Sequence, residues 1–554
     1  MAAIVTPLLT KFSGATYTSD CEAASIGEWS GSPVSDTINN LENAGCLSKK
    51  VSNSYLSFVY TLGSSFNFTA AGHTHIYVWM MVTTLGKLET RENGGIRIRV
   101  EGATTSDFKE WYVGGKTYGG KPDYAGGWKC FVIDTTKTPD RTGGTVNLNS
   151  VPKVGVGFIM SVSVTGNVTN CFWDVMREGS GLLITGGTSG TPGTFQDILD
   201  AEDGSTAKYG ILRKEGGVLF CSGELIFGDA SGITDTYFTD TGQVIIFEDK
   251  QVNSELYKIK IQGNATGTTQ IKFGTKIGSG ESAVGNAGCT FRSANKSATP
   301  FQIDCLQSNV GIWGFYACIF QNGGVTKFDK ISTNTADLIS CSWINMNQAD
   351  VNDSFVRNCT FSGYTSDTIG ALKWNSSIDI KRCAFNANTD VTNNPAAIEH
   401  PAQGTFTYTD LTFSGNDYDI NYTAPASSGV LTILKSGTSN PETSKILNPT
   451  GNSVSIEAST TVNITIVNSA GATITANCEV TIVKISDESI LFEEDNIVDG
   501  TTSYGFTTGG GTATYINVHN VAGYQNRTVY YTLPSSGTVN LEIQLDDERY
   551  YSNP

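Results

Sequence analysis

The sequence has 554 residues, which is too many for one ordinary domain and predicts about three or four. Charged residues make up only 16% of the chain and glycine occurs 61 times, so the composition disfavours helices and predicts an all-β fold. The formal net charge of −17 argues against binding to nucleic acid or to an anionic membrane, because both need a positively charged surface. A neutral glycan or another protein is compatible with this charge.

The first residues show no targeting segment. No basic stretch precedes the short apolar start, and Pro7 interrupts it, so we expect no secretory signal. No run approaches the roughly 18 apolar residues that a membrane span requires. The twelve cysteines include no Cys-x-x-Cys pair, so neither a disulfide scaffold nor a zinc ribbon is expected.

Long alternating apolar segments characterise residues 1–190 and predict a β-sandwich. In residues 96–100 apolar positions alternate with Arg97 and Arg99, which indicates a half-buried strand whose arginines face solvent. The predicted strands of this part cover residues 76–82, 96–100, 128–133 and 154–160.

A glycine-rich stretch, residues 181–193, is interpreted as a linker to a short helix. Thr194 with Asp197 resembles a capping box, and the apolar residues after it share one face, so residues 194–202 are predicted to form an amphipathic helix. Such a helix would cover the open end of a solenoid, where unpaired strands invite aggregation. Apolar runs typical of strands follow at residues 217–220, 224–228, 244–247 and 257–261.

The middle of the chain repeats the form Cys-x-aromatic at intervals of 18 to 29 residues, with leucine in place of cysteine in the last copy. Residues i and i+2 of a strand point to the same side, so the cysteine and the ring are predicted to point inward together. Five of the six copies run into small polar residues that accept left-handed or tight-turn geometry. The copies are residues 289–291, 318–320, 341–343, 359–361, 383–385 and 411–413.

Repeats of this length, each with short strands and sharp turns, are typical of a solenoid. Stacked coils would align the thiols in one ladder and the rings in another. A metal or redox cluster is the competing interpretation of the cysteines. No histidine or carboxylate recurs beside them, so buried and inert thiols are favoured.

The Cys-x-aromatic form stops near residue 425, and cleanly alternating segments with turns between them follow. Short strands with turn signals between them predict a small immunoglobulin-like sandwich. The alternating segments are residues 462–467, 478–483, 515–518 and 539–545.

With these parts in this order, the chain resembles bacteriophage virion structural proteins of the spike, fibre or head-decoration type. Residues 181–188 followed by 194–198 are similar to the segment that enters the β-helix in such proteins. Residues 358–363 (Asn-Cys-Thr-Phe-Ser-Gly) are similar to the rungs of pectin-lyase-like helices, and Gly126-Gly127-Trp128 before a strand is similar to concanavalin-like folds.

The resemblance implies an all-β architecture in three domains. A concanavalin-like β-sandwich is expected in residues 1–190, and a right-handed parallel β-helix with a short capping helix in residues 191–425. An immunoglobulin-like β-sandwich is expected in residues 426–554.

The resemblance also implies a structural protein on the virion surface, assembled in the host cytoplasm. Other virion proteins and a host-surface polysaccharide are its expected partners, with a homotrimer favoured as the assembly. No cofactor, nucleic acid or membrane is expected. Trp374 and Tyr364, if exposed, are candidates for stacking on the glycan, and a ring buried in a coil is the competing interpretation of each.

Two alternatives stay open, a polysaccharide depolymerase on the same scaffold and a capsid decoration protein without a ligand. Glycoside hydrolysis needs two carboxylates set about 5–10 Å apart. Asp350 with Asp353, and Asp379, are the candidates, although polar loop residues are the simpler interpretation. The favoured prediction is that the chain is not an enzyme.

His73 and His75 are the remaining candidates for chemistry. On a strand they would share one side, as half of a metal site. Because His400 and His519 are distant in sequence, a solvated pair is favoured and no metal is expected.

Overall fold

The computed structural model is nearly all β, with 57% of residues in strands and 4% in helices, so the predicted all-β class is confirmed. It contains a large parallel sheet of at least 19 strands, which is consistent with a β-helix. The structure describes residues 3–14, 21–41, 45–51, 55–70, 73–116, 127–161, 169–202, 210–229, 235–247, 258–263, 269–276, 288–294, 301–305, 312–329, 335–352, 354–366, 369–375, 380–387, 394–458, 460–506, 510–534 and 537–547.

The chain divides into two compact units, which are treated one at a time below. The first unit comprises Met1–Tyr237, Ile245–Lys260 and Ser293–Gln302, and the second comprises Phe238–Val244, Ile261–Arg292 and Ile303–Pro554. Within the described ranges, no helix has the length and apolar character needed to cross a membrane.

Two antiparallel groups of strands enclose the main hydrophobic core of the first unit. The five-stranded sheet has the order β4 (Tyr55–Phe66), β10 (Val151–Ile159), β6 (Ile96–Glu101), β7 (Phe108–Gly114) and β9 (Arg141–Gly143). The other group contains β1 (Ala3–Lys11), β2 (Val34–Asp36), β3 (Cys46–Val51), β5 (His75–Val82), β8 (Lys129–Asp134) and β11 (Thr169–Gly186). The short 3-10 helices are η1 (Ala23–Glu28), η2 (Leu85–Lys87) and η3 (Arg91–Asn93). The four strands predicted for this part are present as β5, β6, β8 and β10.

The alternation along β6 is as predicted, but the solvent exposure of its arginines is not. Ile96 and Ile98 lie in the core, whereas Arg97 and Arg99 point to the opposite side and are only 0% and 5% exposed. The prediction that these arginines face solvent is therefore wrong. They are buried because aromatic rings and carboxylates of the same sheet cover them, an arrangement that a single strand pattern does not reveal.

The first part of the glycine-rich stretch expected as a linker, residues 181–186, is strand. β11 continues to Gly186 and pairs antiparallel with β1 over residues 177–186. Its end also pairs parallel with β14 (Glu224–Phe227). Leu182 and Ile184 are fully buried. The burial of these apolar side chains outweighs the flexibility of the glycines, so residues 181–186 are not a linker.

The predicted helix is confirmed as α1 (Phe195–Glu202). Asp197 Oδ2 accepts hydrogen bonds from the Thr194 backbone N–H at 2.7 Å and from the Thr194 hydroxyl at 2.9 Å, as in a capping box. Phe195 and Ile198 are fully buried, and the helix contacts β1 and β12 (Leu212–Glu215). The helix therefore covers strands of the first unit with its apolar face.

Short strands follow this helix. β12 is antiparallel to β13 (Val218–Cys221), which is parallel to β16 (Val244–Phe247). β15 (Thr236–Asp240) and β17 (Lys258–Ile261) complete this part of the chain. The four apolar runs predicted here correspond to β13, β14, β16 and β17.

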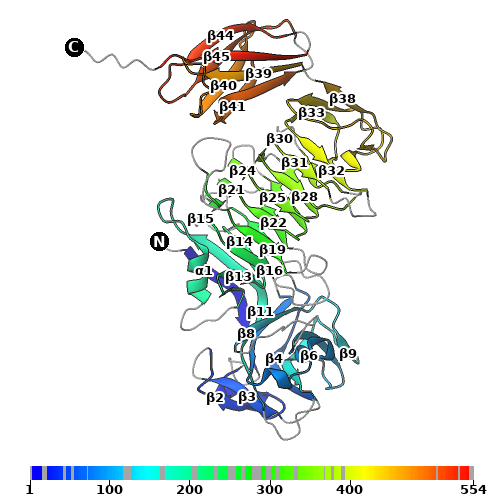
Figure 1. Cartoon of the computed structure of the whole chain (residues 1–554). Coiled ribbons are helices and arrows are strands. Elements are labelled where there is room, and N and C mark those ends of the chain that lie inside the picture. The colour runs from blue at the N-terminus through cyan, green and yellow to red at the C-terminus, as the bar shows by residue number, and fades with distance from the viewer. Residues whose placement is uncertain are drawn as a thin grey trace, which may run out of the picture. The chain divides into compact units, whose positions relative to one another are not determined.

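The second unit contains three rows of parallel strands, coloured green to yellow in Figure 1, and each coil from β18 to β35 gives one strand to each row. The first row is β18 (Thr269–Phe273), β21 (Ile312–Tyr316), β24 (Thr335–Ile339), β27 (Phe355–Arg357), β30 (Ile380–Lys381), β33 (Gly404–Thr409), β36 (Leu431–Ser436) and β38 (Val454–Ala458). The second row is β19 (Thr290–Ser293), β22 (Ile319–Gln321), β25 (Ser342–Ile344), β28 (Thr360–Ser362), β31 (Ala384–Asn386) and β34 (Thr412–Ser414). The third row is β20 (Gln302–Cys305), β23 (Val325–Asp329), β26 (Gln348–Asn352), β29 (Leu372–Trp374), β32 (Ala396–His400), β35 (Tyr418–Tyr422) and β37 (Ile446–Leu447).

The second row carries the predicted ladders of rings and thiols. Trp343 stacks on Phe361 with ring centroids 4.7 Å apart, and Phe361 stacks on Phe385 at 4.8 Å. All twelve cysteines of the chain are free and buried. The Sγ of Cys341 donates to the carbonyl of Phe315 at 3.2 Å, and burial raises the pKa of this thiol well above its usual value. The ring ladder is confirmed, and the thiols are buried as predicted.

The C-terminal part of the second unit consists of two sheets around one core. The three-stranded sheet has the order β42 (Thr501–Phe506), β39 (Thr460–Val467) and β45 (Thr538–Gln544). The four-stranded sheet has the order β41 (Ile490–Ile497), β40 (Cys478–Lys484), β43 (Ala513–His519) and β44 (Arg527–Thr532).

Candidate functional site

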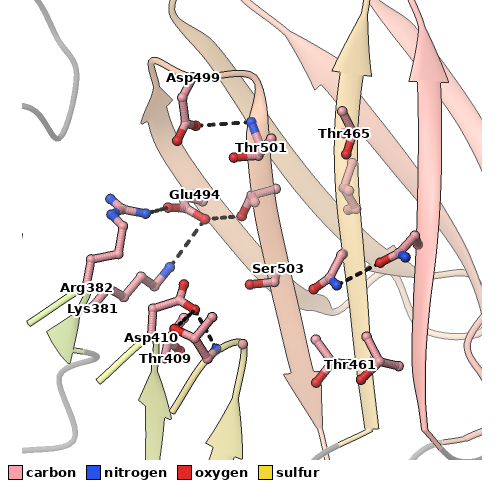
Figure 2. Close-up of a pocket in the computed structure, with 17 residues that line it drawn as sticks. Lys381, Arg382, Thr409, Asp410, Thr461, Thr465, Glu494, Asp499, Thr501 and Ser503 are labelled. Carbon is pink, nitrogen blue, oxygen red and sulfur yellow. Dashed lines mark hydrogen bonds and ion pairs between the residues drawn. The ribbon is translucent and has the colours of Figure 1, made fainter. Parts of the chain in front are cut away.

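A polar groove of about 500 Å³ lies in the second unit, between the last coils and the three-stranded sheet. One wall is formed by coil residues, including Arg382 and Asp410, and the other by sheet residues, including Asn463, Ser503 and Asn540. We call this recess the junction groove. Figure 2 shows the side chains of both walls pointing into it.

The sheet wall follows from the alternation along β39. Val462, Ile464 and Ile466 are fully buried in the core, so the residues between them face the other way. Asn463 is in register with Ser503 of β42 on one side and Asn540 of β45 on the other. Its Nδ2 donates a hydrogen bond to Asn540 Oδ1 at 2.8 Å.

Threonines continue this row in both directions along the sheet. Thr461 is in register with Thr538, and Thr465 with Thr501. All four line the junction groove. The wall is thus a grid of hydroxyl and amide groups held on three hydrogen-bonded strands, and it carries no charge.

The coil wall is built from residues in left-handed backbone geometry. Arg382, Asp410 and Gly437 occupy equivalent corners of successive coils, with φ of 53°, 52° and 60°. Asp410 Oδ1 accepts the backbone N–H of Thr438 at 2.7 Å and its hydroxyl at 3.1 Å. The sharp corner aims the side chains of Arg382 and Asp410 outward, into the junction groove.

A buried carboxylate connects the two walls. Glu494 of β41 is 5% exposed, and its oxygens lie 3.4 Å from Lys381 Nζ and 3.7 Å from Arg382 NH1 (Figure 2). Thr502 also donates its hydroxyl to Glu494. Since a buried charge is tolerated only when it is paired and hydrogen-bonded, this cluster fixes the coil against the C-terminal sheets.

The charges around the junction groove nearly cancel. Lys381 and Arg382 stand against Asp410, Glu494 and Asp499, which gives a formal balance of −1. Asp499 Oδ1 accepts the Thr501 backbone N–H at 3.1 Å. Each of these three carboxylates already receives hydrogen bonds or ion pairs from the protein.

Two smaller recesses adjoin the junction groove. One of about 170 Å³ shares Thr409 and Ser503 with it, and is also lined by Trp374 and Tyr504. The other, of about 100 Å³, shares Arg382, Glu494, Asp499 and Thr501. The polar surface therefore extends beyond the space for one small ligand.

The two rings predicted to bind glycan are both in the interior. Trp374 is 1% exposed and stacks on Tyr408 at 5.7 Å, and its indole N–H has no hydrogen-bond partner within the described part of the chain. Tyr364 is 4% exposed and hydrogen-bonds to Asn416. Glycan stacking was predicted only for exposed rings, and neither ring is exposed. Trp374 borders the 170 Å³ recess, and Tyr364 lines none of the recesses described here.

Of the three predicted carboxylates the structure describes one, and this one is paired with a cation. Asp350 Oδ2 lies 3.4 Å from Lys373 Nζ, and Asn375 donates to its other oxygen. Asp353 and Asp379 lie outside the described residues. Within the described residues, neither set of candidate carboxylates is therefore complete.

The two histidines of the candidate pair differ in their surroundings. His75 begins β5, whereas His73 precedes it and its Nδ1 lies 2.7 Å from Glu178 Oε2. Among the described residues, no group of three or more His, Cys, Asp or Glu side chains is placed to hold a metal ion.

Two comparisons of the sequence with known proteins found no match. The sequence matches no protein-family model, and no curated protein is significantly similar to it. The fold defines the class of this chain as a nearly all-β protein with a large parallel sheet.

Proposed function

We propose that this chain is a surface protein of a bacteriophage virion, a spike, fibre or capsid projection, and that its junction groove attaches the particle to a neutral host-surface glycan. The observation that supports this most is the uncharged grid of hydroxyl and amide groups on one wall of the groove. Sugars present alternating hydroxyl donors and acceptors, which such a grid matches.

The electrostatics of the groove support a neutral ligand. Its charged side chains sum to a formal −1 and are engaged with one another, with Thr502 or with backbone N–H groups. A charged ligand would have to break these contacts. A neutral polyol would instead bond to Asn463, Ser503 and Asn540, whose rigid strands lose little entropy on binding.

The same occupied carboxylates favour binding over hydrolysis. General acid–base cleavage of a glycosidic bond needs one carboxyl to donate a proton and another to act as base or nucleophile. Asp410 and Asp499 each stabilise their own turn, and Glu494 is held by two cations. Depolymerase activity and a decoration role without ligand are the outcomes that would replace this proposal.

The domain architecture and assembly belong to the same proposal. Residues 1–190 form a concanavalin-like sandwich, 191–425 a right-handed parallel β-helix and 426–554 an immunoglobulin-like sandwich. The chain assembles in the host cytoplasm as a homotrimer that contacts other virion proteins. Sedimentation equilibrium of the purified chain tests the trimer, and a particle of 59.1 kDa, the mass of one chain, would contradict it.

The decisive experiment combines location and binding. Immunogold labelling of virions with antibody to this chain is expected to mark the particle surface. Wild-type protein is expected to bind neutral envelope polysaccharide of the host in calorimetry. The double variant Asn463→Ala/Asn540→Ala should bind it at least about tenfold more weakly, since about two hydrogen bonds of roughly 1 kcal/mol each are lost.

The matched control is Asn517→Ala, which removes an amide from the four-stranded sheet, where Thr528 donates to it at 2.8 Å. This variant should bind as the wild type does. Equal binding by all three proteins would refute the junction groove as the site. Release of reducing sugar from the polysaccharide would replace attachment with depolymerisation, and absence of label from intact particles would refute the virion location.

A further inference from the structure

The outer side of the five-stranded sheet in the first unit carries a charged layer that is almost fully buried. Arg97, Arg99 and Glu101 alternate with the core residues of β6 and are 0%, 5% and 3% exposed. Glu110 of β7 is 0% exposed on the same side. Burying four charges is costly unless each is paired, so their partners define what this surface can still bind.

Most of the N–H donors of Arg99 are used by neighbouring groups of the first unit. Its Nε donates to Glu101 Oε1 at 2.6 Å and its NH1 to Glu110 Oε1 at 2.6 Å. Its NH2 donates to the Thr105 carbonyl at 3.0 Å, and its guanidinium lies 3.9 Å from the centroid of the Phe108 ring. Arg99 therefore supplies positive potential, while most of its N–H donors are already engaged.

A recess of about 270 Å³ lies above this layer. Gly155 of β10 is in register with Val59 and Arg99 and adds no side chain to this side of the sheet. Hydroxyl groups of Ser57 and Thr61 line the recess, together with Lys153.

Two groups in this recess are available to a ligand. Ser57 Oγ is shielded from solvent and has no hydrogen-bond partner among the described residues. Lys153 Nζ, on a side chain that is 23% exposed, is 3.9 Å from Glu101 Oε2, which is beyond hydrogen-bond distance. A buried hydroxyl without a partner costs free energy that a ligand would recover.

The local charge favours an anion although the whole chain is strongly negative. Arg97, Arg99, Arg141 and Lys153 face two carboxylates, Glu101 and Glu110, which leaves a formal +2 within a chain of −17. Of the two cations that line the recess, Arg99 is mostly engaged and Lys153 lies beyond hydrogen-bond distance of Glu101, so the site suits one negative charge with hydroxyl groups beside it better than a dianionic phosphate.

We propose that this recess binds the carboxylate-bearing ring of an acidic sugar. Lys153 pairs with the carboxylate, Ser57 and Thr61 hydrogen-bond to ring hydroxyls, and Val59 packs against the apolar face of the ring. The site belongs to the first unit and is independent of the junction groove, so either site stands if the other fails.

Isothermal calorimetry of the full chain with sodium glucuronate, with glucose as the neutral probe, tests the proposal. Glucuronate should bind and glucose should bind at least about tenfold more weakly, because the ion pair is lost. Lys153→Gln should lower the glucuronate affinity about tenfold, whereas Lys153→Arg should retain most of it. Ser57→Ala should weaken binding of both sugars to a smaller extent.

The control is Lys50→Gln, which removes an exposed lysine of β3 that does not line the recess. Its affinity for glucuronate should equal that of the wild type, and the thermal midpoints of all variants should agree. Wild-type affinity in Lys153→Gln would overturn the proposal. Inorganic phosphate that binds as tightly as glucuronate would also overturn it, because the hydroxyl contacts would then contribute nothing.

Discussion

His400 is a fully buried imidazole between aromatic rings. Its Nε2 lies 2.8 Å from the Tyr408 hydroxyl, and the Phe406 ring centroid is 4.3 Å away. Its Nδ1 has no hydrogen-bond partner within the described residues. Burial lowers the pKa of His400 to about 3, because the charged form would lose its hydration without gaining an acceptor.

This imidazole makes stability depend on pH. The pKa is lowered in the folded state, so below the ordinary histidine pKa of about 6.5 the unfolded chain binds a proton that the folded chain does not. The free energy of unfolding should fall by about 1.4 kcal/mol per pH unit from pH 6.5 towards 3. Urea denaturation of wild type and His400→Gln should differ by about 2 kcal/mol more at pH 7 than at pH 5.

Other titrating groups are common to both proteins and cancel in that difference. His519→Gln is the control, since the side chain of His519 is 32% exposed and pairs with Glu479. A difference between wild type and His400→Gln that does not change with pH would show that His400 is not kept neutral by burial.

At the scale of one coil, four of the six strands of the ring ladder (β22, β25, β28 and β34) lie between two left-handed residues. Asn322, Gly363 and Gly415 follow the ring with φ of 56°, 69° and 70°, and the sequence predicted such geometry from their residue types. Asn345 also has a φ of 53°, although the copy at Trp343 was the exception to the predicted turn pattern. The residue before the cysteine is also left-handed, with φ of 51° at Ala317. Alanine has no preference for this region, so its residue type gives no signal of the corner.

Substitution by glycine should therefore change the free energy of unfolding in opposite directions at two alanines of the coils. Ala317→Gly relieves an unfavourable φ that costs about 1–2 kcal/mol, which exceeds the roughly 0.5–1 kcal/mol of added chain entropy, and should stabilise slightly. Ala384→Gly lies in regular strand β31 and should destabilise by roughly 0.5–1 kcal/mol. Urea midpoints measure both, and equal losses in the two variants would contradict the corner geometry.

The same contrast separates what the sequence could predict from what it could not. The period of two along β6, and the capping box of α1, are local patterns, and the structure contains both elements. The pairing of β39 with β45 joins residues more than 70 positions apart, so no pattern in either strand places Asn463 beside Asn540. The junction groove depends on that pairing and on a coil corner, and sequence reasoning missed it.

At the scale of the second unit, the Lys381–Glu494 pair holds the last coils to the C-terminal sheets. Both side chains are about 5% exposed. Lys381→Met should lower the free energy of unfolding by about 3 kcal/mol, because Glu494 would keep only the Thr502 hydroxyl and the longer contact with Arg382. Urea denaturation measures this loss.

Two further variants give this prediction its controls. Lys381→Met/Glu494→Met should regain most of the lost stability, because no unpaired charge stays buried. Lys484→Met breaks the exposed pair with Asp487 and should leave the stability nearly unchanged. If the single variant at Lys381 were as stable as the wild type, the pair would have no structural role.

The continuous strand β11 has a mechanical consequence for the first unit. It pairs with β3 over residues 169–173, with β5 over 171–179, with β1 over 177–186 and with β14 over 181–184. A load along this strand is carried by many hydrogen bonds at once, in shear, rather than by one after another as in a peeled hairpin. Force that reaches the antiparallel sheets therefore passes directly to the first parallel strands, without a compliant segment at residues 181–186 to absorb it.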